Sequence, residues 1–288
     1  MTKLGFIGGG NMAEALMRGL LEKKVFKPAD LIASDVDRSR RQHLKRRLRV
    51  DTTEHNLEVL RSSRALLLAV KPQNIGEVLD EMAAAMRSGV DSANGATGKA
   101  PRPIKLKDRL FISIAAGIPI ARLTEILGAG ARVIRVMPNA PAMVGQGMAA
   151  LVRARGASKA DEAFALRIFR AVGDAVTLTD ETLLDAVTAL SGSGPAYVYL
   201  FVKAMADAAV TEGLPPELAT RMALKTIRGA EENMRQSPLA AAELIRIVAS
   251  PGGTTEAALR KFAEAGFSDI VADALHAAAA RSRELGRS

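Results

Sequence analysis

The first part of the chain alternates short apolar runs with segments in which apolar residues recur at helical spacing. Residues 11–22 show the helical pattern, with Met12, Leu16 and Leu20 on one face. The apolar runs lack polar alternation and predict strands at residues 3–7, 31–34, 65–70, 111–114, 133–136 and 175–178. Strands of this kind, separated by helices, are typical of a parallel sheet covered on both faces. We therefore predict a doubly wound α/β domain over residues 1–178.

Beyond residue 179 the pattern is helical throughout. Helices are predicted at residues 182–190, 196–212, 216–236, 239–248 and 254–285, with no convincing strand among them. These segments are rich in alanine and apolar on several sides, and this part of the chain is short for burying so many apolar faces. We therefore predict an all-helical dimerisation domain over residues 179–288. The expected protein partner is a second copy of the chain, in a homodimer or a larger homo-oligomer.

Length and composition exclude several classes of protein. With 288 residues and 48% hydrophobic composition, the chain can build one large or two ordinary domains with real cores. Cysteine is absent, which excludes disulfides, thiolate ligands and thiol nucleophiles, and we expect no metal site. The longest apolar runs, such as residues 65–70, are too short to span a bilayer, and the N-terminus shows no signal-peptide pattern. We expect a cytoplasmic protein with no membrane partner.

The formal net charge of +9 raises the question of nucleic-acid binding. Lys and Arg are densest at residues 38–49 and are otherwise scattered among acids. Only 3% of the residues are aromatic, too few for an obvious base-stacking platform. The charge pattern therefore favours a solvated basic face, and we expect no nucleic-acid partner.

The first chemical motif is G-x-G-x-x-A, formed by Gly8, Gly10 and Ala13 between a predicted strand and a predicted helix. Gly8 permits a tight turn, Gly10 lets a pyrophosphate approach the backbone, and Ala13 lets the helix pack closely on the sheet. The helix N-terminus presents free N–H groups to the phosphates. This placement predicts a Rossmann-like domain that binds a dinucleotide; the alternative is a bare structural turn.

The second predicted strand ends in Ser34 and Asp35, and Arg38, Arg40 and Arg41 follow. An acid at this point favours the free 2′-hydroxyl of NAD, whereas a serine hydroxyl and arginines favour the 2′-phosphate of NADP. Both kinds of residue are present, so the pattern is ambiguous. We favour NADPH as the cofactor, with NADH as the alternative.

The second half offers no usable histidine as an acid for reducing a ketone. The three histidines of the chain, His43, His55 and His276, stand in contexts that look exposed or helical. Lys203 suggests a 3-hydroxyacid dehydrogenase, but it lies nine residues beyond Gly194 and is read as a solvated helix residue. A reductase without a strong built-in acid suits an easily protonated imine. A dinucleotide-sensing or scaffold protein remains a further alternative.

Six blocks along the chain carry a family resemblance. They read GFIGGGNMAEAL, AVKPQ, SIAAGI, RVIRVMPNAP, DAVTALSGSGPAYVYLF and SPGGTTEAAL. In this order they resemble pyrroline-5-carboxylate reductase over nearly the whole chain. The resemblance implies NAD(P)H-dependent reduction of the cyclic imine 1-pyrroline-5-carboxylate to L-proline, the last step of proline biosynthesis. It also implies a Rossmann domain followed by a helical dimerisation domain.

The resemblance also implies the site residues. The family's cofactor contacts fall on Gly8, Gly9, Gly10, Asn11, Met12, Ser34, Asn56, Ala69, Val70, Lys71, Pro72, Ala115, Ala116 and Gly117. Its substrate contacts fall on Ser250, Gly253, Thr254 and Thr255, with Glu181 as a further candidate. Thr255 is the expected catalytic residue, with its hydroxyl on the ring nitrogen of the imine.

The block SPGGTTEAAL, residues 250–259, has a physical rationale for binding the small carboxylate substrate. A helix N-terminus whose glycines expose successive N–H groups is a ready anion site. The alternative is a plain helix cap, with Ser250 as the N-cap and Pro251 at the first helical position.

Three features depart from the family pattern. The family usually has threonine at the position of Ala140 and often a polar residue at that of Ile247, so a polar ligand contact is missing at each. Residues 89–103, rich in Gly, Ala, Ser and Pro, predict an exposed, mobile loop that is longer than the family requires.

Overall fold

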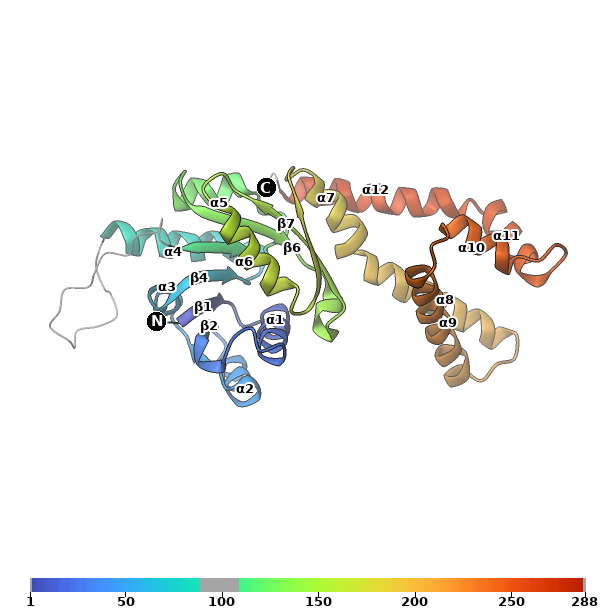
Figure 1. The fold of residues 1–288 in the computed structure, drawn as a ribbon, viewed down its shortest axis with the longest axis horizontal. Coiled ribbons are helices and arrows are strands. Elements are labelled where there is room, and N and C mark those ends of the chain that lie inside the picture. Colours follow the sequence, from blue (N-terminus) through green and yellow to red (C-terminus); the bar gives the residue numbers. More distant parts are fainter. Residues whose placement is uncertain (1, 89–108, 287–288) are drawn as a thin grey trace. The chain divides into compact units, whose positions relative to one another are not determined.

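The computed structural model describes residues 2–88 and 109–286, so the loop predicted at residues 89–103 lies outside the described residues. The chain forms two compact units, Met1–Gly192 together with Ala279–Ser288, and Ser193–Ala278 (Figure 1). The division into domains 1–178 and 179–288 remains a prediction. Among the described helices, none combines the length and apolar character needed to cross a membrane.

The first unit is built on one sheet, which has eight strands within the described residues (Figure 1). The strands are β1 (Thr2–Ile7), β2 (Leu31–Ser34), β3 (Asp51–Thr53), β4 (Ser63–Leu68), β5 (Leu110–Ser113), β6 (Arg132–Met137), β7 (Gly147–Arg153) and β8 (Gly173–Leu178). Their order is β3-β2-β1-β4-β5-β6-β7-β8. The order reverses between β1 and β4, and doubly wound sheets bind ligands at the carboxyl ends of the strands at such a point. The predicted α/β, Rossmann-like class is confirmed.

Helices cover both faces of this sheet and enclose an apolar core on each. They are α1 (Asn11–Glu22), α2 (Arg38–Leu48), α3 (Asn56–Ser62), α4 (Ile75–Ser88), α5 (Ile120–Leu127) and α6 (Lys159–Phe169). On one face, Leu16 of α1 and Phe169 of α6 share a core with Phe6 of β1. On the other, Leu79 of α4 shares a core with Phe111 of β5. Burial on both faces explains why the strands are apolar without alternation.

The sequence pattern misses two strands, and the sheet is not parallel throughout. β3 consists of three polar residues, Asp51–Thr53, at the edge of the sheet. β7 follows the 3₁₀ helix Ala140–Val144, after which the chain reverses, and it runs antiparallel to β6. Ala149 and Ala150 lie in β7, and alanine is a weak strand former. The apolar run of β7 therefore does not stand out in the sequence.

The later part of the chain is helical, as predicted. α7 (Leu183–Val187) and a π-helical turn (Thr188–Gly192) end the main segment of the first unit. The following helices are α8 (Gly194–Thr211), α9 (Pro216–Gln236), α10 (Ala241–Val248), α11 (Thr254–Glu264) and α12 (Phe267–Leu285). The single helix predicted over residues 254–285 is wrong. Gly266, with φ of 66°, ends α11 in the left-handed conformation that glycine adopts without strain.

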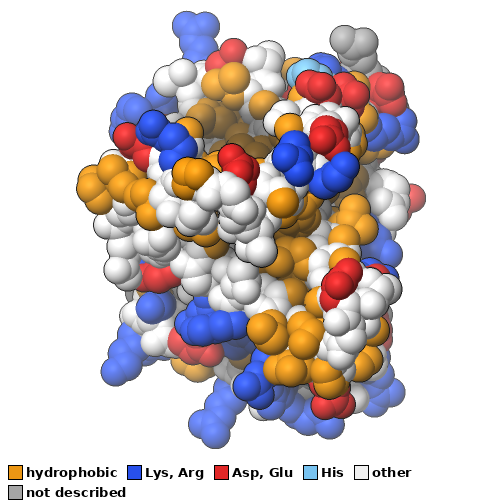
Figure 2. All heavy atoms as spheres, turned by 90° about the vertical axis from the view of Figure 1, so that its right-hand side faces the viewer, with side chains coloured by type: hydrophobic (Ala, Val, Ile, Leu, Met, Phe, Trp, Pro, Cys, Tyr) orange, Lys and Arg blue, Asp and Glu red, His pale blue; other side chains and the backbone are white. Residues whose placement is uncertain are grey.

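The second unit buries few large apolar side chains. Its buried core consists of Ala206, Ala219 and Ala223, between α8 and α9. Many larger apolar side chains are exposed instead, and Figure 2 shows groups of them at the surface. They include Tyr199, Leu200, Met222, Leu224, Ile245, Ile247, Val248 and Ile270. Such exposed apolar surface is typical of helices that bind a partner.

Candidate active site

The turn between β1 and α1 contains the three consecutive glycines of the predicted dinucleotide motif. Gly8 has φ of 94°, and a Cβ built there would lie 2.9 Å from the backbone C and O of Ala69. The Gly8 N–H donates to the carbonyl of Ser34 over 2.9 Å. Glycine is therefore required for both the turn and its close approach to the residue after β4.

The N-terminus of α1 is available to an anion. Gly10 is the N-cap residue, and no side chain caps the helix. The N–H groups of Gly10, Asn11 and Met12 have no hydrogen-bond acceptor among the residues that the structure describes. A Cβ at Gly10 would meet no atom within 4 Å, so the space beside it is open, while Ala13 is fully buried against the sheet. This geometry fits a dinucleotide pyrophosphate.

Ser34 and Asn56, two predicted cofactor contacts, form a hydrogen bond with each other. Ser34 is fully buried, and its Oγ donates to Asn56 Oδ1 over 2.7 Å. Asn56 Nδ2 donates in turn to Glu81 Oε2 over 2.8 Å. The Ser34 hydroxyl is thus engaged inside the protein, and this geometry does not support its expected use as a donor to a 2′-phosphate.

The carboxylate of Asp35 accepts two backbone N–H groups. Oδ2 accepts from Gly9 over 2.9 Å, and Oδ1 accepts from Asp37 over 2.9 Å. Asp37 is the N-cap of α2, and its side chain accepts from the N–H of Ser39 over 2.7 Å. Asp35 is therefore fixed beside the glycine turn, where an acid at the end of the second strand binds the adenosine ribose.

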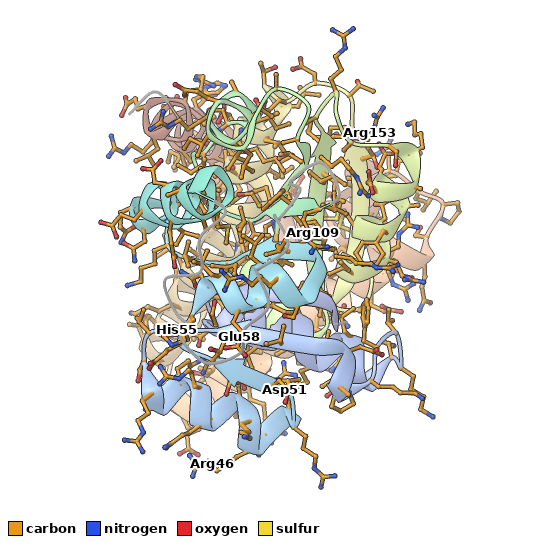
Figure 3. All side chains as sticks on the ribbon, turned by 90° about the vertical axis from the view of Figure 1, so that its left-hand side faces the viewer. Arg46, Asp51, His55, Glu58, Arg109 and Arg153 are labelled. Carbon is orange, nitrogen blue, oxygen red and sulfur yellow. The ribbon has the colours of Figure 1, made fainter. Side chains whose placement is uncertain are left out.

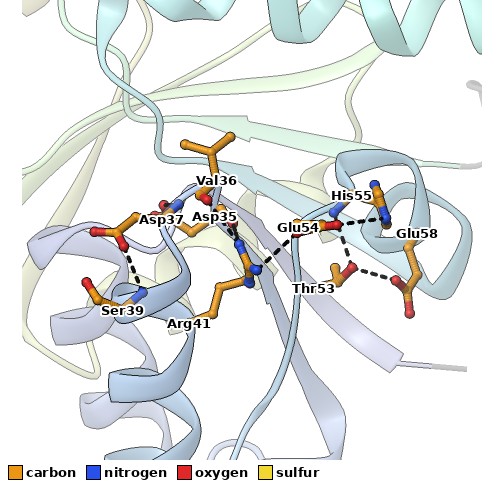
Figure 4. A network of polar contacts seen from close by, with 9 residues as sticks. All are labelled: Asp35, Val36, Asp37, Ser39, Arg41, Thr53, Glu54, His55 and Glu58. Carbon is orange, nitrogen blue, oxygen red and sulfur yellow. Dashed lines mark hydrogen bonds and ion pairs between the residues drawn. The ribbon is translucent and has the colours of Figure 1, made fainter.

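The three arginines that follow are not equivalent. Arg41 donates to the carbonyls of Asp35 and Val36 and pairs with Glu54 at 3.1 Å (Figure 4). Arg40 pairs with a glutamate of α1. Arg38 is exposed and has no ion-pair partner within residues 2–88 and 109–286. Of the three, Arg38 has the charge that is freest to meet a 2′-phosphate.

Two further predicted cofactor segments follow neighbouring strands. Ala69, Val70, Lys71 and Pro72 come after β4, and Ala115, Ala116 and Gly117 come after β5. β4 and β5 are parallel neighbours, so the two segments leave the same edge of the sheet. Pro72 and Ala116 line one cavity, together with Leu285 at the end of α12. The structure thus brings these two predicted segments together.

Glu181 has two protein partners in the first unit. Its Oε1 accepts from the backbone N–H of Ile120 over 2.8 Å and from Arg135 Nη1 over 2.7 Å. Ile120 is the first residue of α5, and that helix has no side-chain cap at Pro119. Glu181 therefore holds the start of α5, just after the predicted cofactor residue Gly117. A substrate contact at Glu181 remains a prediction.

The SPGGTTEAAL segment lies in the second unit and leads into α11. The helix begins at Thr254 with Gly253 as its N-cap, so the alternative with Ser250 as the cap and Pro251 at the first helical position is wrong. The N–H groups of Thr254 and Thr255 have no acceptor in the described part of the chain. Thr254 is exposed and Thr255 is half-buried.

Sequence reasoning misses the roles of Glu256 and Arg135, and it assigns Arg40 to a 2′-phosphate rather than to the glycine turn. Glu256 Oε2 accepts from the Gly252 N–H over 2.6 Å and so lies at the start of α11. Arg40 contacts the glycine turn, and Arg135 holds Glu181. A glutamate two residues after a helix start is a common first-turn signal, whereas the two arginine contacts join distant positions. Lys203 is confirmed as a solvated helix residue, since its ion pair with an aspartate is exposed.

Comparison with known families and proteins agrees with this geometry. Residues 3–95 match the family "NADP oxidoreductase coenzyme F420-dependent", and residues 181–285 match "Pyrroline-5-carboxylate reductase dimerisation". The chain is 39% identical to the pyrroline-5-carboxylate reductase of Synechocystis sp., over 99% of this chain and 98% of that protein. It is 40% identical to the enzyme of Pseudomonas aeruginosa, over 98% of this chain and 96% of that protein.

Solved structures give the same result. A pyrroline-5-carboxylate reductase from Coxiella burnetii is 30% identical with a TM-score of 0.86, covering 100% of this chain and 99% of that chain. Pyrroline carboxylate reductase from Plasmodium falciparum, solved with NADP bound, is 30% identical with a TM-score of 0.84. The match covers 99% of this chain and 98% of that chain. The chain belongs to the pyrroline-5-carboxylate reductase family.

Proposed function

We propose that this protein reduces 1-pyrroline-5-carboxylate to L-proline with NADPH, and with NADH as the alternative cofactor. The observation that carries the proposal is the uncapped start of α1 behind the Gly8–Gly10 turn, at the point where the strand order reverses. An open space beside Gly10 and free N–H groups at the helix start fit a dinucleotide. Membership of the family supplies the imine substrate.

In this proposal the first unit holds the cofactor. Gly8, Gly9, Gly10, Asn11 and Met12 bind its pyrophosphate, and Asn56 and the strand-end segments Ala69–Pro72 and Ala115–Gly117 line the rest of its path. When bound, the dihydronicotinamide supplies the hydride. The hydrogen bond from Ser34 supports an indirect role for that residue, in which it orients the Asn56 amide.

The start of α11 is proposed to hold the substrate. The free N–H groups of Thr254 and Thr255 suit a carboxylate, and Ser250 and Gly253 flank them. The Thr255 hydroxyl is proposed to hydrogen-bond the ring nitrogen of the imine. The imine reacts in its protonated form, so that as hydride adds to C5 the electron pair of the C=N bond moves to nitrogen and a neutral amine forms. The threonine hydroxyl accepts a hydrogen bond from the N–H and keeps that nitrogen oriented. Positioning of this kind makes the step effectively unimolecular.

The proposal includes assembly with a second copy of the chain. The apolar side chains exposed on α8–α12 and the match of residues 181–285 to a dimerisation family support a homodimer or larger homo-oligomer. The cytoplasmic location expected from the sequence remains a prediction.

The decisive test is the decay of NADPH or NADH absorbance when pyrroline-5-carboxylate is added, with proline identified as the product. Gly10→Ala tests the cofactor site against the wild-type protein. The added Cβ would meet no protein atom within 4 Å but would enter the space proposed for the pyrophosphate. We expect the variant to fold normally and to bind the cofactor weakly. Cofactor binding by the wild-type protein without reduction of any cyclic imine would instead favour a dinucleotide-sensing protein.

A further inference from the structure

Gly9, in the middle of the glycine turn, is held by two charged side chains that follow β2. Its N–H donates to Asp35 Oδ2 over 2.9 Å, and its carbonyl accepts from Arg40 Nε. The same guanidinium donates through Nη2 to Glu14 of α1. Both peptide groups that flank Gly9 are therefore tied to side chains outside the turn.

These contacts set the direction of the groups that face the cofactor site. A trans peptide group is planar, so its C=O and its N–H point in opposite directions. With the Gly9 carbonyl directed at Arg40, the Gly10 N–H is directed away from Arg40. That N–H has no acceptor in the described residues and lies at the open start of α1. Glycine otherwise samples the widest range of backbone conformations, and ordering it on binding would weaken the cofactor's affinity.

Glu14 keeps Arg40 in this orientation. The side chains of Arg40 and Glu14 are 20% and 19% exposed, so their ion pair is better shielded than a surface pair. His43 Nε2 lies 2.9 Å from the second oxygen of Glu14. Burial opposes the charge of Glu14, but hydrogen bonds from His43 and Arg40 outweigh it and lower its pKa below the usual value. Glu14 is therefore ionised at neutral pH.

We propose that Arg40, held by Glu14, is a positioning residue that fixes the Gly9 carbonyl and presets the glycine turn for the dinucleotide pyrophosphate. This inference rests on the proposed function, because it concerns the same cofactor. It replaces the direct contact between Arg40 and a 2′-phosphate that the sequence suggests. The two roles differ in a measurable way, since NADH and NADPH share the pyrophosphate but not the 2′-phosphate.

The test compares dissociation constants for NADH and NADPH, measured by cofactor fluorescence, in Arg40→Met, Arg40→Lys and Glu14→Gln. Arg46→Met is the control, because Arg46 is an exposed arginine of the same helix (Figure 3) and its loss changes the net charge equally. Releasing one or two glycine peptides should raise both dissociation constants by about five- to thirty-fold in Arg40→Met. Arg40→Lys should recover part of the lost affinity. Glu14→Gln should raise the dissociation constants of both cofactors.

For Arg40→Met, kcat at saturating cofactor and imine should stay within about twofold of the wild-type value. This result would separate loss of positioning from general damage to the fold. A rise confined to NADPH in Arg40→Met, or tighter NADPH binding in Glu14→Gln, would overturn the inference in favour of a direct 2′-phosphate contact. Wild-type affinity in Arg40→Met would also overturn it. If the wild-type protein bound neither cofactor, the proposed function would fail first and the inference with it.

Discussion

Glu181 Oε1 lies 2.7 Å from Arg135 Nη1 and also accepts the N–H of Ile120 over 2.8 Å. The Arg135 side chain is only 12% exposed, so it depends on this carboxylate for its countercharge. One glutamate thus joins β6 to the start of α5, the helix that follows the predicted cofactor residues Ala115–Gly117.

We expect Glu181→Ala to lower the free energy of unfolding by about 1 to 3 kcal/mol, because it leaves a half-buried N–H and a guanidinium unpaired. The control is Glu125→Ala, which removes an exposed pair with Arg122 and should cost at most about 1 kcal/mol. Denaturant unfolding measures both.

If Glu181 also contacts the substrate, Glu181→Gln will raise KM for the imine at unchanged cofactor affinity. An unchanged KM would remove Glu181 from the substrate site.

Cofactor preference should depend on Asp35 and Arg38. The Asp35 carboxylate repels a 2′-phosphate, and of the three arginines Arg38 has the freest positive charge. Arg38→Met should therefore lower the ratio of kcat/KM for NADPH to that for NADH, and Asp35→Asn should raise this ratio. The ratio is the measure because Asp35 also accepts the Gly9 N–H, and loosening the glycine turn affects both cofactors alike. Each ratio should change by about tenfold, or about 1.4 kcal/mol. The measurement is kcat/KM with each cofactor. A wild-type preference for NADH of about tenfold or more would mean that Asp35 dominates and that NADPH is the wrong assignment.

The glycine turn could be predicted because its signal is local. Gly8 follows an apolar strand directly and Ala13 lies in the first turn of α1, so a short window contains the whole motif. By contrast, the contact from Arg40 to Gly9 spans 31 residues and that from Glu181 to Ile120 spans 61. Such contacts depend on which strands become neighbours, and a single sequence does not specify that order residue by residue.

The errors in the fold predicted from the sequence have similar causes. Strand direction is not encoded in apolar content, so the reversal that makes β7 antiparallel to β6 leaves no periodic signal. The break at Gly266 did have a local signal, since glycine is the preferred residue just past a helix end. The alanine-rich pattern on both sides concealed it, because alanine fits every face of a helix.

Asp161 should contribute stability that disappears in acid. Its side chain is 6% exposed and accepts from Arg132 Nε over 3.1 Å and from the Ser158 N–H over 2.8 Å. Burial opposes its charge, but the hydrogen bonds from Arg132 and Ser158 outweigh it and lower the pKa below the usual 3.8. The Asp161 carboxyl therefore takes up a proton more readily in the unfolded chain than in the native protein. Its contribution to stability is complete above its pKa in the unfolded chain, and it is lost as pH falls through its pKa in the folded protein.

Asp161→Asn should therefore cost about 2 to 3 kcal/mol in the free energy of unfolding at neutral pH. The difference from wild type should narrow below about pH 4. Urea unfolding at a series of pH values checks this expectation, and a difference that stays constant down to pH 3 would contradict it.

The helices of the second unit should bury their exposed apolar side chains against a second copy. Leu200 and Ile270 are 69% and 59% exposed, respectively, so a charge at either position would have to be desolvated on association. We expect Leu200→Glu and Ile270→Glu to shift the protein toward monomer in sedimentation experiments. Thr220→Glu, an exposed polar position of α9, is the control for added charge. A fully active wild-type monomer at working concentration would argue against this assembly.

The final prediction separates catalysis from helix capping at the start of α11. Gly253 is the N-cap, so neither Thr254 nor Thr255 caps the helix, and Thr255→Val removes a hydroxyl while keeping shape and β-branching. If that hydroxyl bonds the imine nitrogen, its loss should cost about 1 to 3 kcal/mol, or roughly fivefold to more than a hundredfold in kcat/KM. Thr255→Ser should retain most activity.

Thr254→Val is the matched control, because the exposed Thr254 is expected to offer the substrate only its backbone N–H, which valine keeps. Its effect on kcat/KM should be mild, and NADPH affinity should be unchanged in all three variants, since the proposed cofactor residues all belong to the first unit. Melting temperatures test for damage to α11. Equal activity of Thr255→Val and wild type would reduce the role of this segment to its backbone N–H groups, because the side chain would then have no part in orienting the imine.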